Sequence, residues 1–318
     1  PTNSRSNETR IVREFDVIAR YFSSFGASRR VELSVGDDAA ALSVPPDSEL
    51  IVSTDSSVLG THFTDDTFSE HVGYKAVASA ASDLAAMGAE PLAMTLGLTM
   101  PSVDDLWLHG LSQGLAKACR HYALPLVGGD TTRGPLALTV TVMGFCPRGQ
   151  KLLRSGAHVG DRVCVSGTLG DAAFGLSLVQ GKHRGIDIDF DAQDYLVNRL
   201  SFPLARIDLG VALRGLATSC IDVSDGLLQD ASHIANASGC RLVIHQDAIP
   251  LSTPLIEAAG DRHALQLALT GGEDYELLFT LPADCDIPDG TVVIGSVEAG
   301  EGVDCGLTLE ETGYDHFH

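Results

Sequence analysis

The feature that most constrains the fold is an alternation of strand-like and helix-like segments that occurs twice along the chain. In the first run, apolar segments suited to strands at 49–55 and 91–100 flank an alanine-rich segment at 70–87 with apolar residues at helical spacing. The alternation stops at the turn-like sequence CPRGQ, near residue 148, and starts again with the apolar segment 161–167. Such a chain is expected to fold as α/β (α+β), with two domains.

The predicted boundary divides the chain into two α+β halves, an N-terminal domain of residues 1–148 and a C-terminal domain of residues 149–318. A length of 318 residues favours two domains, and 44% hydrophobic residues are enough for more than one core. Residues 1–10, PTNSRSNETR, are polar and lack the apolar core of a signal peptide. We expect them to form a disordered tail.

The same patterns predict the elements of each domain. Helices are expected at 11–25, 70–87, 103–122, about 172–179, most of 190–203 and 205–216, 227–237 and 263–272. Strands are expected at 49–55, 91–100, 124–128, 136–145, 161–167, 219–225, 241–246, 275–282 and 291–297. Gly88 is placed just after the alanine-rich helix, and a glycine-rich turn containing Asp130 is expected between 124–128 and 136–145.

Charge and cysteine content restrict the partners and the compartment. There are 42 acidic and 21 basic residues, a formal net charge of −21. Such a field repels nucleic acid and anionic membranes, and no apolar run approaches the ~20 residues of a membrane helix. Neither nucleic acid nor a membrane is therefore expected as a partner. Seven scattered cysteines with no CxxC predict reduced thiols and a cytoplasmic protein.

Aspartates recur among small residues, beside or inside apolar segments. They lie in the sequences GDDAA (Asp37, Asp38), STDSS (Asp55), ASDLAAMG (Asp83), GGDTT (Asp130) and IDVSDG (Asp222, Asp225).

Taken singly, most of these aspartates have a simple structural explanation. Asp55 and Asp130 fit turns, and Asp225 fits the N-cap of the helix predicted from residue 227. Asp83 is harder to explain, because a negative charge near a helix C-terminus opposes the macrodipole by about 0.3–1 kcal/mol. The joint pattern favours cation ligands. Carboxylate oxygens select hard cations such as Mg²⁺, whose sites usually serve phosphates, and the zinc, HExxH and GxSxG motifs are missing from the sequence.

Two further segments suggest binding. In VSGTLGDAAFGL, a predicted strand, Gly167, Gly170 and a helix start could form a phosphate cradle, although the segment lacks the GK[ST] of a Walker A motif and also fits a plain strand–turn–helix connection. Arg154 could supply a positive charge nearby. In TGGEDYELLF, Glu273 and Asp274 follow two glycines directly, an unusual place for a charged pair unless something binds there.

These motifs resemble the thiamine-monophosphate kinase family, within the superfamily of aminoimidazole-ribonucleotide synthetase and selenophosphate synthetase. The similar segments, in family order from about residue 31 to 317, are GDDAA, STDSSVLGTHF, SDLAAMGAEP, LVGGDTTRGP, RSGAHVGD, SGTLGD, IDVSDGL, GGEDYEL and GYDHF. The Asp motifs are shared across the superfamily, whereas GGDTTRGP and GYDHF are more specific to the kinase. A threonine precedes GGEDYEL where the family often has serine.

The resemblance implies that ATP and thiamine monophosphate give ADP and thiamine diphosphate, with several Mg²⁺ ions. It also implies an N-terminal α/β domain, which binds ATP and Mg²⁺ and forms a homodimer through its sheet, and a C-terminal α+β domain. By position, Mg²⁺ binding falls on Asp38, Ser53, Thr54, Asp55, Asp83, Asp130, Asp222 and Asp225, with Asp37 an alternative to Asp38. ATP contacts fall on Gly129, Asp130, Arg154 and Ser224. Substrate contacts fall on His62, Glu273 and Tyr314.

The chemistry of that reaction suits these residue types. The acceptor is a phosphate monoester, largely dianionic at neutral pH because its second pKa is about 6, so no side-chain base or nucleophile is expected. Metal ions held by carboxylates would neutralise the repulsion between acceptor and triphosphate. Tyr314 could attract the thiazolium cation of the substrate, whereas His62 also fits an ordinary loop histidine.

Two alternatives remain at this level. The chain could be another ATP-dependent member of the superfamily acting on a different small acceptor. It could instead be a non-catalytic, cation-binding dimer that has kept the fold.

Overall fold

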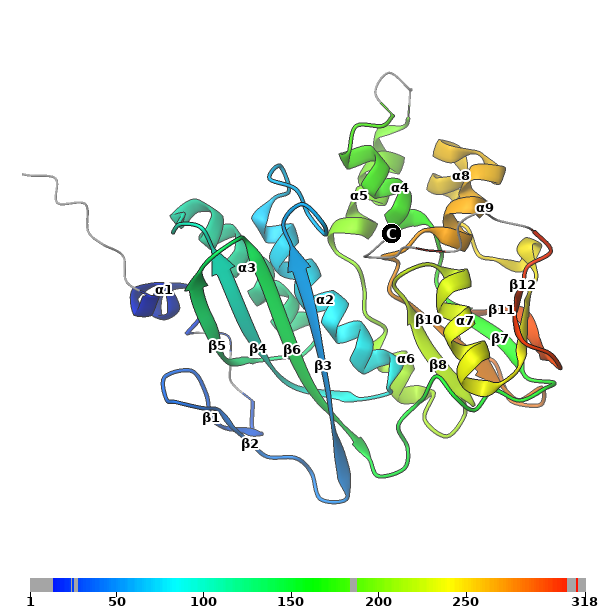
Figure 1. Cartoon of the computed structure of the whole chain (residues 1–318), viewed down its shortest axis with the longest axis horizontal. Helices are drawn as coiled ribbons and strands as arrows, with labels where there is room; N and C mark the ends of the chain where they lie inside the picture. The colour runs from blue at the N-terminus through cyan, green and yellow to red at the C-terminus, as the bar shows by residue number, and fades with distance from the viewer. Residues whose placement is uncertain (1–13, 24, 26–27, 184–187, 308–312, 314–318) are drawn as a thin grey trace, which may run out of the picture.

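The computed structural model of the chain describes residues 14–23, 25, 28–183, 188–307 and 313. The two larger of the three sheets among these residues lie in two neighbouring domains, each with helices packed against it (Figure 1). The predicted α/β, two-domain fold is therefore confirmed. The first sheet ends at Pro147 and the second begins at Arg162, and the exact division at residue 148 stays a prediction. The predicted tail, residues 1–10, and Tyr314 lie outside the described residues.

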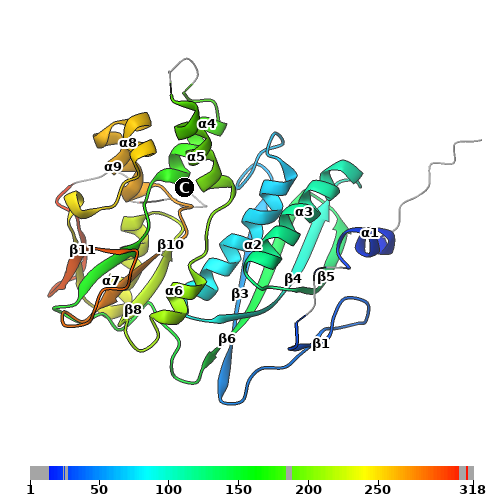
Figure 2. The same ribbon diagram turned by 180° about the vertical axis from the view of Figure 1, so that it is seen from behind.

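The N-terminal domain is built on a four-stranded sheet in the order β3-β6-β4-β5. Its strands are β3 (Ser48–Val58), β6 (Ala137–Pro147), β4 (Glu90–Met100) and β5 (Leu126–Arg133). The β4–β5 pair is parallel and the other pairs are antiparallel. Helices α2 (Ser69–Ala86) and α3 (Asp105–His121) cover one face (Figure 2). On the other face, toward the viewer in Figure 1, none of the described helices lies over β3 and β6. Outside this sheet lie α1 (Glu14–Tyr21), β1 (Val31–Leu33) and β2 (Ala41–Leu42).

The C-terminal domain has a six-stranded sheet in the order β12-β9-β11-β7-β10-β8. Its strands are β7 (Arg162–Ser166), β8 (Ser219–Val223), β9 (Arg241–Ile244), β10 (Glu276–Leu281), β11 (Thr291–Glu298) and β12 (Gly302–Asp304). Its helices are α4 (Asp171–Val179), α5 (Phe190–Ser201), α6 (Ile207–Ala212), α7 (Leu227–Ser238), η1 (Gln246–Ala248), α8 (Thr253–Ala259) and α9 (Asp261–Thr270). None of the described helices is both long enough and apolar enough to span a membrane.

Helix α2 lies where the two domains meet, because its small residues allow close approach from several sides. Most of its residues are buried, and Gly88 ends it with φ 62°, as predicted. Lys75, Ser79 and Asp83 are spaced by four residues and so share one face of the helix. That face meets the C-terminal domain, since Lys75 forms an ion pair with Glu273.

The glycine-rich turn expected around Asp130 is wrong. Strand β5 continues through this segment to Arg133, with Gly129 opposite Leu96 and Asp130 opposite Gly97 of β4. Gly129 permits this because it has φ 149° and no side chain. A Cβ there would lie 1.9 Å from the carbonyl oxygen of Leu96. Helix α8 and strands β1, β2 and β12 were not predicted, because they are short and weakly patterned.

We expect Gly129→Ala to destabilise the protein by roughly 2 kcal/mol or more, because a β-carbon adds a backbone clash to a φ that costs a non-glycine residue about 1–3 kcal/mol. The matched control is Gly128→Ala, where the nearest atom to a new Cβ is Thr95 Cγ2 at 3.8 Å. Urea unfolding of the two variants measures the difference. Equal midpoints would contradict the close approach of β5 to β4.

Candidate active site

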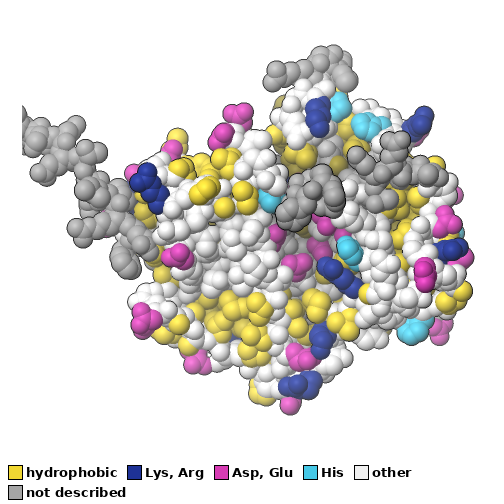
Figure 3. Space-filling view, in the orientation of Figure 1, with side chains coloured by type: hydrophobic (Ala, Val, Ile, Leu, Met, Phe, Trp, Pro, Cys, Tyr) yellow, Lys and Arg dark blue, Asp and Glu magenta, His cyan; other side chains and the backbone are white. Residues whose placement is uncertain are grey.

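Acidic side chains from three distant parts of the chain meet at the junction of the two domains, in the middle of the face shown in Figure 3. Asp55 comes from β3, Asp83 from α2 and Asp222 from β8. The Ser53 hydroxyl donates a 2.5 Å hydrogen bond to Asp83 Oδ2. We call Asp55, Asp83 and Asp222 the carboxylate cluster.

The carboxylate cluster is electrostatically unfavourable without a counter-charge. Burial, and then repulsion from Asp83, raise the pKa of Asp222 to about 7. Burial also raises the pKa of Asp83, with the hydroxyl of Ser53 acting in the opposite direction and the charge of Asp55 raising it further. Arg154 lowers the pKa of both Asp83 and Asp222. A cation in this place would therefore be strongly attracted.

The loop after β8 is held by a residue that the sequence analysis missed. Asp230 of α7 is buried, and its Oδ2 accepts the backbone N–H groups of Ser224 (3.0 Å), Asp225 (3.1 Å) and Gly226 (3.2 Å). The N-cap of α7 is Gly226, so the N-cap explanation of Asp225 is wrong. Asp225 and Ser224 lie instead in the loop before α7, whose backbone N–H groups are held by the Asp230 carboxylate. The sequence signal for Asp230 was its position in the first turn of α7, directly after the loop that it binds.

The GGEDYEL segment forms the other end of the site. Glu273 and Tyr275 have φ angles of 71° and 54°, in the left-handed region, and their N–H groups donate to the carbonyl oxygens of Ser224 and Val223, each at 2.8 Å. The Glu273 carboxylate accepts a 2.6 Å hydrogen bond from Lys75 Nζ. Lys75 was also missed, although its helical spacing to Asp83 could have revealed it.

Tyr275 connects the two ends. It is buried, and burial, followed by the negative charges of Glu273, Asp55 and Asp222, raises the pKa of its phenol well above the ordinary value of 10. Tyr275 therefore stays a neutral hydrogen-bonding group among carboxylates. Along α2, Lys75 and Asp83 are separated by about 12 Å, which gives the length of the site between its two charged ends.

His62 lies in the turn that follows β3. Its Nδ1 accepts the N–H of Val58 at 3.1 Å, and its own backbone N–H donates to the Val58 carbonyl oxygen at 2.9 Å. This local bonding orients the imidazole ring. A role of His62 toward a substrate stays a prediction.

Other predicted ligands lie on the opposite face of the first sheet. Thr54 alternates with Ser53 and Asp55, and its hydroxyl bonds to that of Thr141 at 2.9 Å, so its main chain alone could join the carboxylate cluster. Asp130 is paired with Gly97 in a row that faces away from α2. Three strand spacings, about 14 Å, separate β5 from β3. One copy of the chain thus does not bring Asp130 to the carboxylate cluster.

Asp38 is likewise separate. It is exposed in the loop between β1 and β2, which Figure 1 places at the lower left, away from the domain junction. Its N–H donates to Asp37 Oδ1 at 2.8 Å. The choice between these two aspartates as ligands stays open.

The predicted phosphate cradle at Gly167 and Gly170 is wrong for this structure. The N–H groups of Gly170 and Ala172 at the start of α4 donate to Asp274 at 2.7 and 3.2 Å. Asp274 is almost fully buried. A carboxylate of the chain itself thus occupies the place expected for a bound anion.

The oxygen atoms of the carboxylate cluster and of the Ser53 hydroxyl are ligands of the type that Mg²⁺ prefers. Across the described ranges, no three Asp, Glu, His or Cys side chains converge in an arrangement that could hold a metal ion by themselves. Mg²⁺, however, usually binds one or two carboxylates together with waters and substrate phosphates. The carboxylate cluster and the Ser53 hydroxyl fit that requirement. The raised pKa values of Asp83 and Asp222 also indicate that a bound cation would be favoured there.

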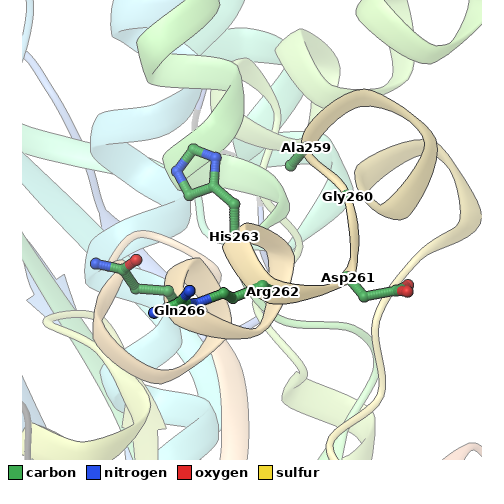
Figure 4. Close-up of a pocket in the computed structure, with 6 residues that line it drawn as sticks. All are labelled: Ala259, Gly260, Asp261, Arg262, His263 and Gln266. Atoms are coloured by element: carbon green, nitrogen blue, oxygen red, sulfur yellow. The ribbon is translucent and has the colours of Figure 1, made fainter.

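Two depressions lie outside the carboxylate cluster. One, of about 540 Å³, is at the junction of α8 and α9 and includes Arg262, His263 and Gln266, with the Asp261 side chain pointing away from them (Figure 4); it contains none of the predicted site residues. The other, of about 440 Å³, is lined by Met100, Val103 and Arg133, among others, next to Asp130 on β5.

Comparison with protein families assigns both domains. Residues 36–146 match the model of the AIR synthase related protein N-terminal domain, and residues 158–304 match that of the C-terminal domain. The thiamine-monophosphate kinase of Escherichia coli K12 is 45% identical over 321 residues, with 96% of this chain and 98% of the relative covered. That of Salmonella typhimurium LT2 is 43% identical over 320 residues with the same coverage.

Solved structures agree. Thiamine-monophosphate kinase from Stenotrophomonas maltophilia K279a superposes with a TM-score of 0.82 at 39% identity, covering 91% of this chain and 94% of that one. A structure described as AaThiL complexed with AMPPCP and TMP gives a TM-score of 0.80 at 33% identity, covering 86% of this chain and 89% of that one. On the combined evidence of motifs, fold and similarity over nearly its whole length, the chain belongs to the thiamine-monophosphate kinase family of enzymes.

Proposed function

We propose that this protein transfers a phosphoryl group from ATP directly to thiamine monophosphate, forming thiamine diphosphate and ADP. The observation that carries the proposal is the convergence of Asp55, Asp83 and Asp222 from three distant segments on one site. The relatives named as thiamine-monophosphate kinases, and the related structure with AMPPCP and TMP, support the choice of substrates.

In this proposal the carboxylate cluster, with Ser53, Asp225 and the main chain of Thr54, would hold Mg²⁺ ions. Asp38 and Asp130, which lie away from the carboxylate cluster within one copy, would complete the set of ligands from the neighbouring copy of the dimer. When bound, Mg²⁺ would neutralise phosphate charge and align donor and acceptor. Arg154, Ser224 and Gly129 contact ATP together with Asp130. The acceptor phosphate is already ionised, so none of these residues needs to move a proton.

The far end of the site orients the rest of thiamine monophosphate. Glu273 presents a carboxylate to the cationic substrate, and Lys75 keeps that carboxylate in place through the 2.6 Å ion pair. His62 and Tyr314 complete the substrate contacts. Tyr275, neutral and buried between the two ends, excludes water from the space beside the carboxylate cluster.

One face of the first sheet is not covered by any of the described helices. Leu50 and Val52 of β3 are 49% and 54% exposed there, and Figure 3 shows hydrophobic side chains gathered over β3 and β6. Hydroxyl pairs, including Ser56 with Thr139 at 2.9 Å, lie on the same face. We propose that two copies pack through this face. In such a dimer, the residues on this face of each copy, including Asp130, would lie close to the other copy.

We further propose a cytoplasmic location. The seven cysteines are all unpaired thiols, and six of them are buried. Such thiols suit a reducing compartment.

The purified protein is expected to form thiamine diphosphate from thiamine monophosphate, ATP and Mg²⁺, which chromatography of the products measures. Free thiamine should react with kcat/KM at least about tenfold lower, because it lacks the charged phosphate that the site recognises. Equal or better use of free thiamine would reverse the substrate assignment. Binding of neither ATP·Mg²⁺ nor thiamine monophosphate in calorimetry would favour the non-catalytic alternative.

Asp222→Asn should lower turnover by orders of magnitude while raising the melting temperature of the metal-free protein at pH 8. The pKa of Asp222 is raised to about 7, so ionising it opposes folding. This penalty is small near pH 4, grows as the pH rises toward 7 and is complete above it. The variant should therefore gain most at pH 8 and little at pH 4.5, and excess Mg²⁺ should restore only part of the turnover.

Melting curves in EDTA at the two pH values, together with steady-state rates, test this expectation. Asp130→Asn is the control, because Asp130 is exposed and its substitution should lower turnover without changing the melting temperature. Near-normal turnover in both variants would contradict the assignment of metal ligands.

Val52→Glu should convert the dimer to a monomer, because it buries a charge in the proposed apolar interface. Light scattering at micromolar concentration measures the mass. The matched control is Val179→Glu on α4, where the side chain is 48% exposed and lies in the other domain. A monomeric wild-type protein, or a dimeric Val52→Glu variant, would rule out this interface.

A further inference from the structure

Side chains alternate in direction along the segment that carries Glu273. Glu273 and Tyr275 face α2 and the carboxylate cluster, as the Lys75 ion pair and the electrostatic partners of Tyr275 indicate. Asp274 and Glu276 point instead into the C-terminal domain and are almost fully buried. The segment thus has one side toward the site and one side that anchors it.

Glu276 is the stronger anchor. Its carboxylate accepts two hydrogen bonds from the Arg206 guanidinium, both at 2.6 Å, one from Arg199 at 3.0 Å and one from the Ser166 hydroxyl at 2.6 Å. A two-point contact of this kind fixes the direction as well as the distance of both partners. A Cβ at Gly167 would lie 2.3 Å from Glu276 Oε1, so the backbone also closes around the carboxylate.

Arg206 connects this anchor to the N-terminal domain. It is the N-cap residue of α6, and α6 lies against the C-terminal part of α2 (Figure 2). The contact is made at Gly210, where a Cβ would lie only 2.0 Å from the carbonyl oxygen of Ala85. Ala85 follows Asp83 by two residues on α2. One rigid path therefore leads from the carboxylate cluster, through α6 and Arg206, to Glu276 and the segment of Glu273.

We infer that Arg206 and Glu276 are positioning residues that keep Glu273 in register with the α2 face carrying Lys75 and Asp83. The inference rests on the proposed role of Glu273 in binding the acceptor. Neither residue touches the site directly. Their effect is to hold Glu273 and Tyr275 in left-handed backbone conformations that non-glycine residues adopt only when their surroundings enforce them.

The test is a double-mutant cycle on the full-length protein with thiamine monophosphate as the acceptor. Arg206→Met leaves Glu276 bonded to Arg199 and Ser166 but removes the link to α6. We expect KM for thiamine monophosphate to rise roughly tenfold, with KM for ATP changed less than about twofold. In a Glu273→Gln background, Arg206→Met should add no further rise, because its effect acts through Glu273.

Arg162→Met is the matched control. Arg162 is an arginine of the same domain, at the start of β7, and its guanidinium donates to the carbonyl oxygens of Pro282 and Cys285, away from the site. It should lower the melting temperature without changing KM for thiamine monophosphate. If Arg206→Met fails to fold, Arg206→Lys replaces it. Lysine keeps the charge but loses the two-point contact, and it should raise the same KM about threefold.

The outcomes separate the two hypotheses. An unchanged acceptor KM in the Arg206 variant, or a rise that adds fully to that of Glu273→Gln, would overturn the positioning role and leave the proposed function intact. An unchanged acceptor KM in Glu273→Gln alone would instead overturn the proposed substrate contact of Glu273, and the inference with it.

Discussion

The arrangement of the site depends on how closely the backbone of α2 approaches its neighbours. A Cβ on Gly114 of α3 would lie 1.9 Å from the carbonyl oxygen of Glu70, and one on Gly73 would lie 2.5 Å from that of Leu111. At the other end, Gly210 of α6 makes a comparable contact with Ala85. Packing of this kind leaves little freedom for sliding or rotation. It fixes the positions of Lys75 and Asp83 along the helix axis. The residues of the C-terminal domain that face them must therefore lie at matching positions.

That rigidity explains how the chain can keep several carboxylates close together. Asp222, Asp230 and Asp274 all have pKa values raised to about 7, with burial as the largest cause. Asp230 accepts three backbone N–H groups and Asp274 accepts two, whereas the rise in the pKa of Asp222 is opposed by the Ser82 hydroxyl, by its own backbone N–H and by the charge of Arg154. The fold thus compensates Asp230 and Asp274 with backbone N–H groups of other residues, and a cation bound at the site would add to the compensation of Asp222.

Much of this could be predicted from local patterns, and the rest depends on contacts between distant segments. The longer strands, the alanine-rich helix with its Gly88 end, and the family follow from periodicity and short motifs. The occupation of the α4 N-terminus by Asp274 could not be predicted, because it joins residues about a hundred positions apart. The same holds for Asp130, whose place in a strand depends on the contact of Gly129 with Leu96. Lys75 and Asp230 are intermediate cases, since their positions on predicted helices could have pointed to them but only their partners reveal what they do.

Strand β3 affects how readily the unassembled chain aggregates. It is eleven residues long and lies at the edge of its sheet, with β6 on its inner side. Leu50, Val52 and Val58 are exposed along it. A long apolar edge of this kind is a template for pairing with strands of other molecules, and natural proteins usually protect such edges. Newly made chains would therefore be most prone to aggregation before this edge and its exposed apolar side chains are covered. A slow or weakened assembly step would then reduce the yield of soluble protein even when each domain folds correctly.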